Sequence, residues 1–385
     1  MSNPETRNTP STGQLASPYP ARHARLAEEL QRAGMDALVL NPGPTLTYLT
    51  GLHFHLMERP VVAIFTPGQP TVIVLPELET GKLEGLPYAV ESFSYGEDLQ
   101  SWDAAFHAAA LAAHLDGKRV GVEPLRLRLI ELRFLEAAAG QASFVSAEPE
   151  IAALRMRKDA TEIAAMQQAV EIAQQALQAT LPAVRVGMTE RELASELSYQ
   201  LLRAGAQPEF PFPPIVSAGP NAANPHAVPG ERPLQPGDLL VIDWGAMYDD
   251  YCSDLTRTFA IGEVDAEWQR IAAVVREANE AGRAACRPGI PAGDVDKAAR
   301  AVIEAAGYGD YFIHRTGHGL GMESHEAPYM RSGNPQILEP GMTFTVEPGI
   351  YIAGQNGVRI EDNVAITISG AQTLSNLPRE LITLG

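Results

Sequence analysis

The sequence predicts two domains, an α/β domain followed by an α+β domain. The chain has 385 residues, which suits two domains of roughly 100–200 residues each. In the first part, short β-branched runs alternate with Ala- and Leu-rich stretches of helical pattern, as in an α/β domain. In the second part, a long helical segment and a proline-rich stretch precede strands and two helices. This part does not alternate strictly, so we expect an α+β domain.

The first domain is expected to follow a leader. Residues 1–20 are rich in Ser, Thr and Pro and have no apolar core, so they favour a flexible leader over a secretory signal. Two β-branched runs, 61–65 and 71–75, flank a Thr-Pro-Gly-Gln-Pro turn and predict a hairpin. The other elements expected here are helices over 21–33, 101–115 and 126–139, strands over 36–40 and 119–122, and a turn over 41–44.

The second domain is expected to begin near a basic segment, with the boundary within 150–158. Asp159 and Glu162 have capping-box spacing at the start of a long helix over 160–181. Nine prolines within 208–236 indicate a stiff loop, because each proline fixes φ. Further helices are expected over 189–204, 265–286 and 293–306. We therefore expect the leader over residues 1–20, the first domain over 21–153 and the second domain over 154–385.

The composition excludes several classes of partner. Acidic residues outnumber basic ones, 47 to 29, for a formal net charge of −18. This charge repels phosphate backbones and anionic lipid, so it argues against nucleic-acid and membrane partners. No apolar run approaches the roughly 18 residues that suggest a spanning helix. Cys252 and Cys286 are too few for a disulfide framework or a cysteine-based zinc site. We expect a cytoplasmic protein.

Two aspartates lie on a predicted hairpin of the second domain. If its turn is centred between Tyr248 and Asp249, Asp243 faces Asp254, with Cβ atoms about 4.5–5.5 Å apart. Facing carboxylates destabilise a sheet unless a cation neutralises them. The alternative is a solvated hairpin tip. Because Asp243 ends an apolar run, where a lone carboxylate is costly to bury, we favour a metal site.

A second pair of carboxylates has the same arrangement. Glu347 and Glu361 are symmetric about Gly354 in a second predicted hairpin. Strand alternation places Arg359 on the same face as Glu361, where it can form a salt bridge that steadies this carboxylate. Two facing pairs in one domain strengthen the metal hypothesis.

The third motif is rich in histidine and glycine. His314 and His318 have the spacing of a helical zinc site, but three nearby glycines argue against a helix. The glycines also lack the spacing and the lysine of a phosphate loop. A glycine-flanked histidine in an extended segment suits close backbone approach to a ligand. We therefore take His318 as the imidazole ligand. Four carboxylates and one imidazole suit Mn²⁺, Co²⁺, Fe²⁺ or Zn²⁺, and their total charge favours more than one ion.

Together these motifs resemble the pita-bread metallopeptidase family (peptidase family M24), specifically its proline-peptidase branch of Xaa-Pro dipeptidases (prolidases) and Xaa-Pro aminopeptidases. The shared features are two aspartates eleven residues apart, Gly-His-Gly, Glu-Pro-Gly, Arg-x-Glu and an upstream Asn-Pro-His-Ala that contains His226. The resemblance covers about residues 21–385. It implies a creatinase-like N-terminal α/β domain followed by an α+β pita-bread catalytic domain.

The resemblance also implies a mechanism. Two divalent ions per subunit, with Mn²⁺ expected first and Co²⁺, Zn²⁺ or Fe²⁺ as alternatives, would cleave the bond before proline. Glu347 would relay a proton, and His226 and His325 would position the substrate and stabilise the oxyanion. Arg359 would support the site and help to bind the substrate. The family suggests a homodimer. The metal ligands implied are Asp243, Asp254, His318, Glu347 and Glu361.

The choice between dipeptidase and aminopeptidase depends on a cation for the substrate's free carboxylate. Arg331, six residues after His325, is our candidate for this substrate-binding role, with Arg59 and His55 as rivals. We prefer an Xaa-Pro dipeptidase, and keep the aminopeptidase as the alternative. Phe210 and Phe212 of the proline-rich loop could line a proline pocket or merely pack the loop. A non-catalytic pita-bread protein that binds peptides is the alternative of another class.

Overall fold

The computed structural model describes residues 17–385, and the chain divides between Leu154 and Arg155 into two compact units. Most of the predicted leader, residues 1–16, lies outside the described residues. The predicted leader extends two residues too far, because helix α1 (Tyr19–Ala33) already begins at Tyr19. The first turn of this helix contains a proline, and proline favours that position. Each unit is described by itself.

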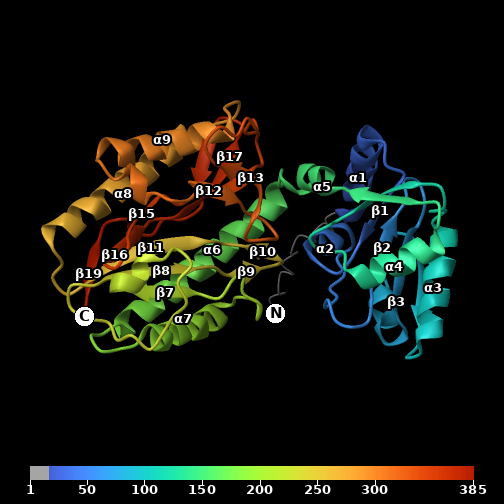
Figure 1. Ribbon diagram of the computed structural model, residues 1–385, viewed down its shortest axis with the longest axis horizontal. Coiled ribbons are helices and arrows are strands. Elements are labelled where there is room, and N and C mark those ends of the chain that lie inside the picture. Colours follow the sequence, from blue (N-terminus) through green and yellow to red (C-terminus); the bar gives the residue numbers. More distant parts are fainter. Residues whose placement is uncertain (1–16) are drawn as a thin grey trace, which may run out of the picture. The chain divides into compact units, whose positions relative to one another are not determined.

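The first unit is an α/β fold built on one mixed sheet (Figure 1). The strand order is β4-β3-β2-β1-β5-β6, and the predicted hairpin is present, with Ala63 opposite Ile73 in an antiparallel pair. Helices α3 and α4 bury Phe106 and Leu135 against the sheet. The strands are β1 (Ala37–Leu40), β2 (Val62–Phe65), β3 (Thr71–Pro76), β4 (Val90–Tyr95), β5 (Arg119–Val122) and β6 (Ser143–Ser146), and the other helices are α2 (Pro44–Thr50), α3 (Leu99–Ala112), α4 (Leu129–Ala138) and α5 (Glu148–Arg155).

Sequence reasoning missed two helices and two strands of this part, namely α2, α5, β4 and β6. The turn expected over 41–44 is instead the approach to α2, in which Pro44 occupies the first helical position. Proline there loses no hydrogen bond, because the first N–H groups of a helix have no intrahelical partner. A proline-containing turn and a helix that begins with proline therefore have similar sequences.

The second unit is an α+β fold whose strands lie between two helix pairs (Figure 1). A four-stranded sheet has the order β19-β11-β8-β7, and a five-stranded sheet has the order β13-β12-β14-β17-β18. Its helices are α6 (Ala160–Thr180), α7 (Glu190–Ala204), α8 (Ala266–Ala285) and α9 (Ala292–Ala305), and its strands are β7 (Ile215–Ala218), β8 (Leu239–Trp244), β9 (Met247–Tyr248), β10 (Tyr251–Cys252), β11 (Leu255–Ile261), β12 (Gly317–Gly319), β13 (Glu326–Met330), β14 (Thr343–Val346), β15 (Gly349–Ile352), β16 (Asn356–Arg359), β17 (Asp362–Thr367), β18 (Gly370–Thr373) and β19 (Ile382–Leu384).

The predicted capping box starts α6. The Asp159 carboxylate accepts hydrogen bonds from the backbone N–H of Glu162, and the Glu162 side chain accepts one from the backbone of Asp159. The buried Trp244 of β8 donates its indole N–H to the Ala173 carbonyl of α6 at 2.8 Å. This bond holds the end of β8, where Asp243 lies, against the helix.

Direct contacts join the four-stranded sheet to the β15–β16 hairpin and to the residues that follow it. Thr256 of β11 forms an isolated bridge with Glu361, and the Thr258 hydroxyl donates to the Arg359 carbonyl at 2.8 Å. Cys252 and Cys286 are buried and free. Among residues 17–385, no helix is long and apolar enough to cross a membrane.

A second capping box, at the start of α7, provides a stability test. The Thr189 hydroxyl accepts a hydrogen bond from the Glu192 N–H at 3.2 Å. Thr189→Ala should lower the free energy of unfolding by about 1 kcal/mol, because an N-terminal N–H loses its partner. Thr189→Ser should retain most of this stability. Differential scanning calorimetry of both variants checks the prediction, and equal midpoints for Ala and Ser would contradict it.

Candidate active site

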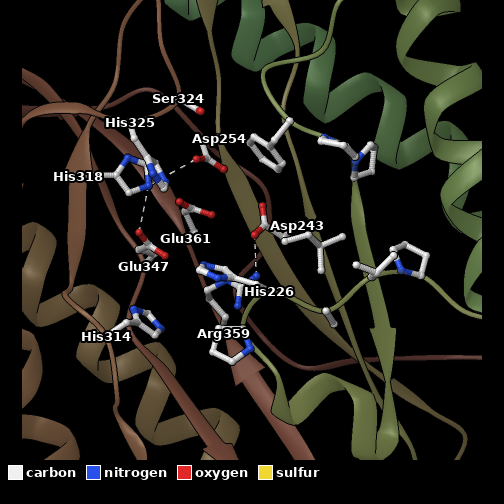
Figure 2. A pocket seen from close by; sticks show the side chains of 18 of the residues that line it. His226, Asp243, Asp254, His314, His318, Ser324, His325, Glu347, Arg359 and Glu361 are labelled. Carbon is white, nitrogen blue, oxygen red and sulfur yellow. Dashed lines mark hydrogen bonds and ion pairs between the residues drawn. The ribbon is translucent and has the colours of Figure 1, made fainter. Parts of the chain in front are cut away.

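A cavity of about 690 Å³ lies in the second unit. One wall is apolar and comes from the proline-rich loop and the segment before β8, including Phe212, Pro213 and Val228. The predicted site residues on the opposite side point into the cavity (Figure 2). The polar residues that line it are His226, Asp243, Asp254, His314, Arg315, His318, Ser324, His325, Glu347, Arg359 and Glu361.

The register predicted for the first hairpin was wrong by two residues. Asp243 pairs with Thr256, and the turn is centred one residue later than expected. Asp249 and Asp250 have φ values of 48° and 67°, which a two-residue hairpin turn requires and which aspartate tolerates. A shift of two keeps a side chain on the same face. Asp254, just before β11, therefore still reaches the cavity with Asp243.

The register predicted for the second hairpin is confirmed. Ile350 of β15 lies opposite Val358 of β16. Val358 and Ile360 are buried in the core between this hairpin and α8. Arg359 and Glu361 alternate to the opposite face and line the cavity, as predicted.

His318 lies in the middle of β12, and its glycine neighbours have a different purpose from the predicted one. A Cβ on Gly317 would lie 1.9 Å from the Thr345 carbonyl oxygen, and one on Gly319 would lie 2.2 Å from that of Ala327. The close approach is therefore to the neighbouring strands rather than to a ligand. Both glycines let β12 lie between β13 and β14, which directs His318 into the cavity (Figure 2).

His318 faces two carboxylates. Its Nε2 atom lies 3.2 Å from Glu347 Oε1 and 3.7 Å from Asp254 Oδ2. Its Nδ1 atom lies 3.2 Å from the Gly319 carbonyl oxygen, which can only accept, so Nδ1 carries a proton. In the neutral ring, the Nε2 lone pair then faces acidic oxygens. Either a proton on Nε2, which then donates to Glu347, or a metal cation between these atoms removes the repulsion.

Asp243 has one oxygen bound and one open. Its Oδ2 accepts a hydrogen bond from Arg359 Nη2 at 2.6 Å, whereas the buried Oδ1 has no hydrogen-bond partner among residues 17–385. Glu361 Oε2 accepts a bond from the Thr256 hydroxyl at 2.7 Å. Ligand atoms of Asp254, His318 and Glu361 all lie within 4.8 Å of one another, and these three residues are buried.

The electrostatics of the site call for positive charge. Burial, followed by repulsion from neighbouring carboxylates, raises the pKa values of Asp254 and Glu361 well above their usual range. Burial likewise raises the pKa of Asp243, despite the opposing charge of Arg359. Burial also tends to raise the pKa of Glu347, but its hydrogen bond with His318 and the positive charges of His318, His314 and Arg359 together outweigh burial and lower that pKa to about 2. The residues present thus fit a divalent-metal site.

Arg359 is fully engaged by protein groups. Its guanidinium donates to Asp243, to the Thr256 hydroxyl at 3.1 Å and to the Tyr351 hydroxyl at 2.8 Å, and its side chain is only 4% exposed. These bonds hold Asp243 in place. They leave little of the guanidinium for the substrate-binding role that we assigned to it from sequence.

The predicted substrate-binding histidines lie on the cavity wall. The ring centroid of His325 is 4.0 Å from that of His318. Burial, and then the charge of His318, lowers the pKa of His325 to about 4, so this ring is neutral at neutral pH. His226 is also exposed, and its backbone N–H donates to the Asn224 side chain at 3.1 Å. Arg331 is exposed in the turn after β13 and does not line the cavity.

Sequence reasoning missed Tyr351, Arg315 and the role of His314. His314 Nδ1 donates to the Arg315 carbonyl at 2.7 Å, so its Nε2 accepts the Tyr351 hydroxyl proton at 2.9 Å. Tyr351 in turn accepts from Arg359. The available signal was the position of His314, four residues before His318, which we dismissed because the segment is not helical. Of the two phenylalanines considered for the proline pocket, Phe212 lines the cavity and Phe210 does not.

Comparison with known proteins shows that the chain belongs to metallopeptidase family M24. The family model matches residues 164–368, and the Creatinase/Prolidase N-terminal domain matches residues 22–157. The second unit is thus a pita-bread domain and the first a creatinase-type domain. The metal expected from the sequence agrees with this family.

Similar proteins cover nearly the whole chain. An Xaa-Pro dipeptidase of Lactobacillus helveticus is 35% identical over 359 residues, 93% of this chain and 97% of the relative. A putative dipeptidase of Bacillus subtilis is also 35% identical, over 94% of this chain and 99% of the relative. The solved prolidase of Thermococcus sibiricus has a TM-score of 0.90 at 35% identity, covering 96% of this chain and all of that one.

The raised carboxyl pKa values predict a pH-dependent effect of metal on stability. Folding favours the protonated forms of Asp243, Asp254 and Glu361, and this contribution is complete only below their unfolded pKa values of about 4. This stabilising contribution is lost as the pH rises through the raised pKa values. Metal-free protein should therefore become less stable relative to metal-loaded protein. The rise in unfolding midpoint on adding Mn²⁺ should therefore increase between about pH 5 and pH 8. A rise independent of pH would contradict this prediction.

Proposed function

We propose that this chain hydrolyses the peptide bond preceding proline with two divalent metal ions, as an Xaa-Pro dipeptidase. The observation that carries this proposal is the convergence of the four predicted carboxylates and His318 in one buried cavity with an apolar wall. The similarity to the Xaa-Pro dipeptidase of Lactobacillus helveticus and the prolidase of Thermococcus sibiricus supports it. We also expect the homodimer and the cytoplasmic location predicted from sequence.

The ions would be held by Asp243, Asp254, His318, Glu347 and Glu361. Mn²⁺ is the ion we expect first, with Co²⁺, Zn²⁺ or Fe²⁺ as alternatives for this mixed oxygen and nitrogen ligand set. When bound, such a pair polarises the scissile carbonyl and activates water for attack at neutral pH. The open Oδ1 of Asp243 and the Nε2 of His318 supply ligand atoms for them.

The protein's own groups would handle protons and charge. Glu347, with a pKa of about 2, is ionised at neutral pH and can accept a proton and pass it to the leaving proline nitrogen. The neutral His325 can donate a hydrogen bond to the substrate carbonyl as negative charge develops on its oxygen. His226, on the same wall, would position the substrate.

The apolar wall suits a proline side chain. Phe212, Pro213, Pro214 and Pro225 form a surface without hydrogen-bonding side chains. A proline ring has no polar atom beyond its amide nitrogen, and its imide bond has no N–H to satisfy. The pocket can therefore bury the ring without leaving a polar group unpaired.

The metal assignment predicts the effect of one conservative substitution. Glu361→Gln should lower both bound Mn²⁺ and hydrolysis of Ala-Pro, the latter by at least about 100-fold, because an anionic ligand is replaced by a neutral one. Glu304→Gln, on the exposed surface of α9, is the matched control and should change neither. Elemental analysis and product assay after metal loading measure the two effects. Activity indifferent to chelation would refute the metal-dependent proposal, whereas absence of hydrolysis by metal-loaded protein would favour the non-catalytic peptide-binding alternative.

Substrate length distinguishes the two peptidase activities. The solved X-Pro aminopeptidase of Thermotoga maritima, with a TM-score of 0.82 at 29% identity, keeps that alternative open. As a dipeptidase, the chain should cleave Ala-Pro with a higher kcat/KM than Ala-Pro-Ala. Chromatographic assay of both peptides checks this prediction, and cleavage of the tripeptide alone would assign the aminopeptidase activity instead.

A further inference from the structure

The wall of the cavity carries two arginines, Arg359 and Arg315, which differ in their partners. Arg359 is buried and bound to Asp243, Thr256 and Tyr351. The partly buried guanidinium of Arg315 forms no ion pair or hydrogen bond with another group among residues 17–385. Its contact is with the ring of Tyr329, 4.6 Å from the guanidinium carbon to the ring centroid.

Stacking on Tyr329 gives Arg315 a defined position near the reaction centre. Tyr329 lies on β13 opposite His318 of β12, and Arg315 lies two residues before β12, so the contact is next to the strand pair that holds the imidazole ligand. Arg315 directly follows His314 and lies three residues before His318. A cation over an aromatic face is attracted to it while its N–H groups, which lie in the guanidinium plane, remain available to another acceptor.

The charge balance of the cavity leaves this cation without a counter-charge. The acidic groups are concentrated at the proposed metal centre, and the chain carries a net charge of −18. A dipeptide brings a free carboxylate close to the bond that is cut, one residue from the scissile carbonyl. In such surroundings that carboxylate needs a permanent cation, and guanidinium binds a carboxylate through two parallel hydrogen bonds.

We propose that Arg315 binds the C-terminal carboxylate of the Xaa-Pro substrate and thereby selects dipeptides over longer peptides. The inference deepens the function proposed above and rests on it. It assigns to Arg315 the role that sequence reasoning gave to Arg331, whose side chain is exposed and lies outside the cavity lining.

The test compares a dipeptide with its neutral amide. Arg315→Gln should lower kcat/KM for Ala-Pro by about 10- to 100-fold and leave that for Ala-Pro-amide nearly unchanged, because only the acid loses a charge-assisted hydrogen bond. Arg315→Lys should retain part of the preference for the acid, since it keeps the charge but not the fork. Arg287→Gln, at an exposed position of the same unit, is the matched control. Unchanged metal content and unfolding midpoints would show that the variants are folded.

Several outcomes would overturn the inference. An equal loss for acid and amide would make Arg315 structural. A loss confined to Glu-Pro relative to Gln-Pro would mean that it binds an acidic side chain before proline. Loss of the acid preference in Arg331→Gln instead would return the role to that residue.

A binding measurement separates this inference from the proposed function. On metal-loaded protein, calorimetry should show tighter binding of L-proline than of L-prolinamide, and Arg315→Gln should abolish the difference. This readout requires no turnover. Equal binding of acid and amide by the unaltered chain overturns the inference, whereas a wild-type chain that binds proline but cleaves no Xaa-Pro peptide contradicts only the proposed function.

Discussion

The mutual repulsion of four buried carboxylates is the constraint on which the rest of this structure depends. They come from the end of β8, the segment before β11 and two positions around the β15–β16 hairpin, so no single element could bring them together. The protein counters their charge with one guanidinium and one imidazole, which is too little to keep every carboxylate ionised. The second unit is therefore arranged for a cation that it does not itself supply, and metal binding is coupled to its stability.

The hydrogen bonds around Arg359 show how such a site is kept in register. The guanidinium binds Asp243 on β8, Thr256 on β11 and Tyr351 on β15. Thr256 in turn donates to Glu361, so one network links the carboxylate of Asp243 on β8 with that of Glu361 after β16. These bonds orient one oxygen of each acid and leave the other free to bind a ligand. Because every member is buried, loss of one leaves the others without partners at a cost of about 1–3 kcal/mol each.

The cavity combines three kinds of surface. Its acidic residues suit cations, its proline-rich wall suits a ring without polar atoms, and Arg315 suits an anion. A zwitterionic dipeptide with proline in second place has three matching features, which are a positively charged amino group, an apolar ring and a negatively charged carboxylate. In this account, selectivity comes from the positions of a few charges on a stiff frame, and proline residues supply that stiffness by fixing φ in the loop that forms the wall.

The sequence by itself determined the fold class, the five candidate metal ligands and the face on which each lies, because strand alternation and hairpin symmetry are local properties. It even determined the β15–β16 register, since a glycine-containing turn marks the centre of that hairpin. The β8–β11 register was missed because two consecutive aspartates adopt positive φ, a conformation that composition does not signal. Only the tertiary structure showed that Arg315 lines the cavity whereas Arg331 does not, and that Tyr351 joins the hydrogen bonds around Arg359. Both findings depend on how far a long side chain reaches and on which neighbours it contacts from strands that are distant in the chain. The spacing of residues in the sequence carries no information about either property.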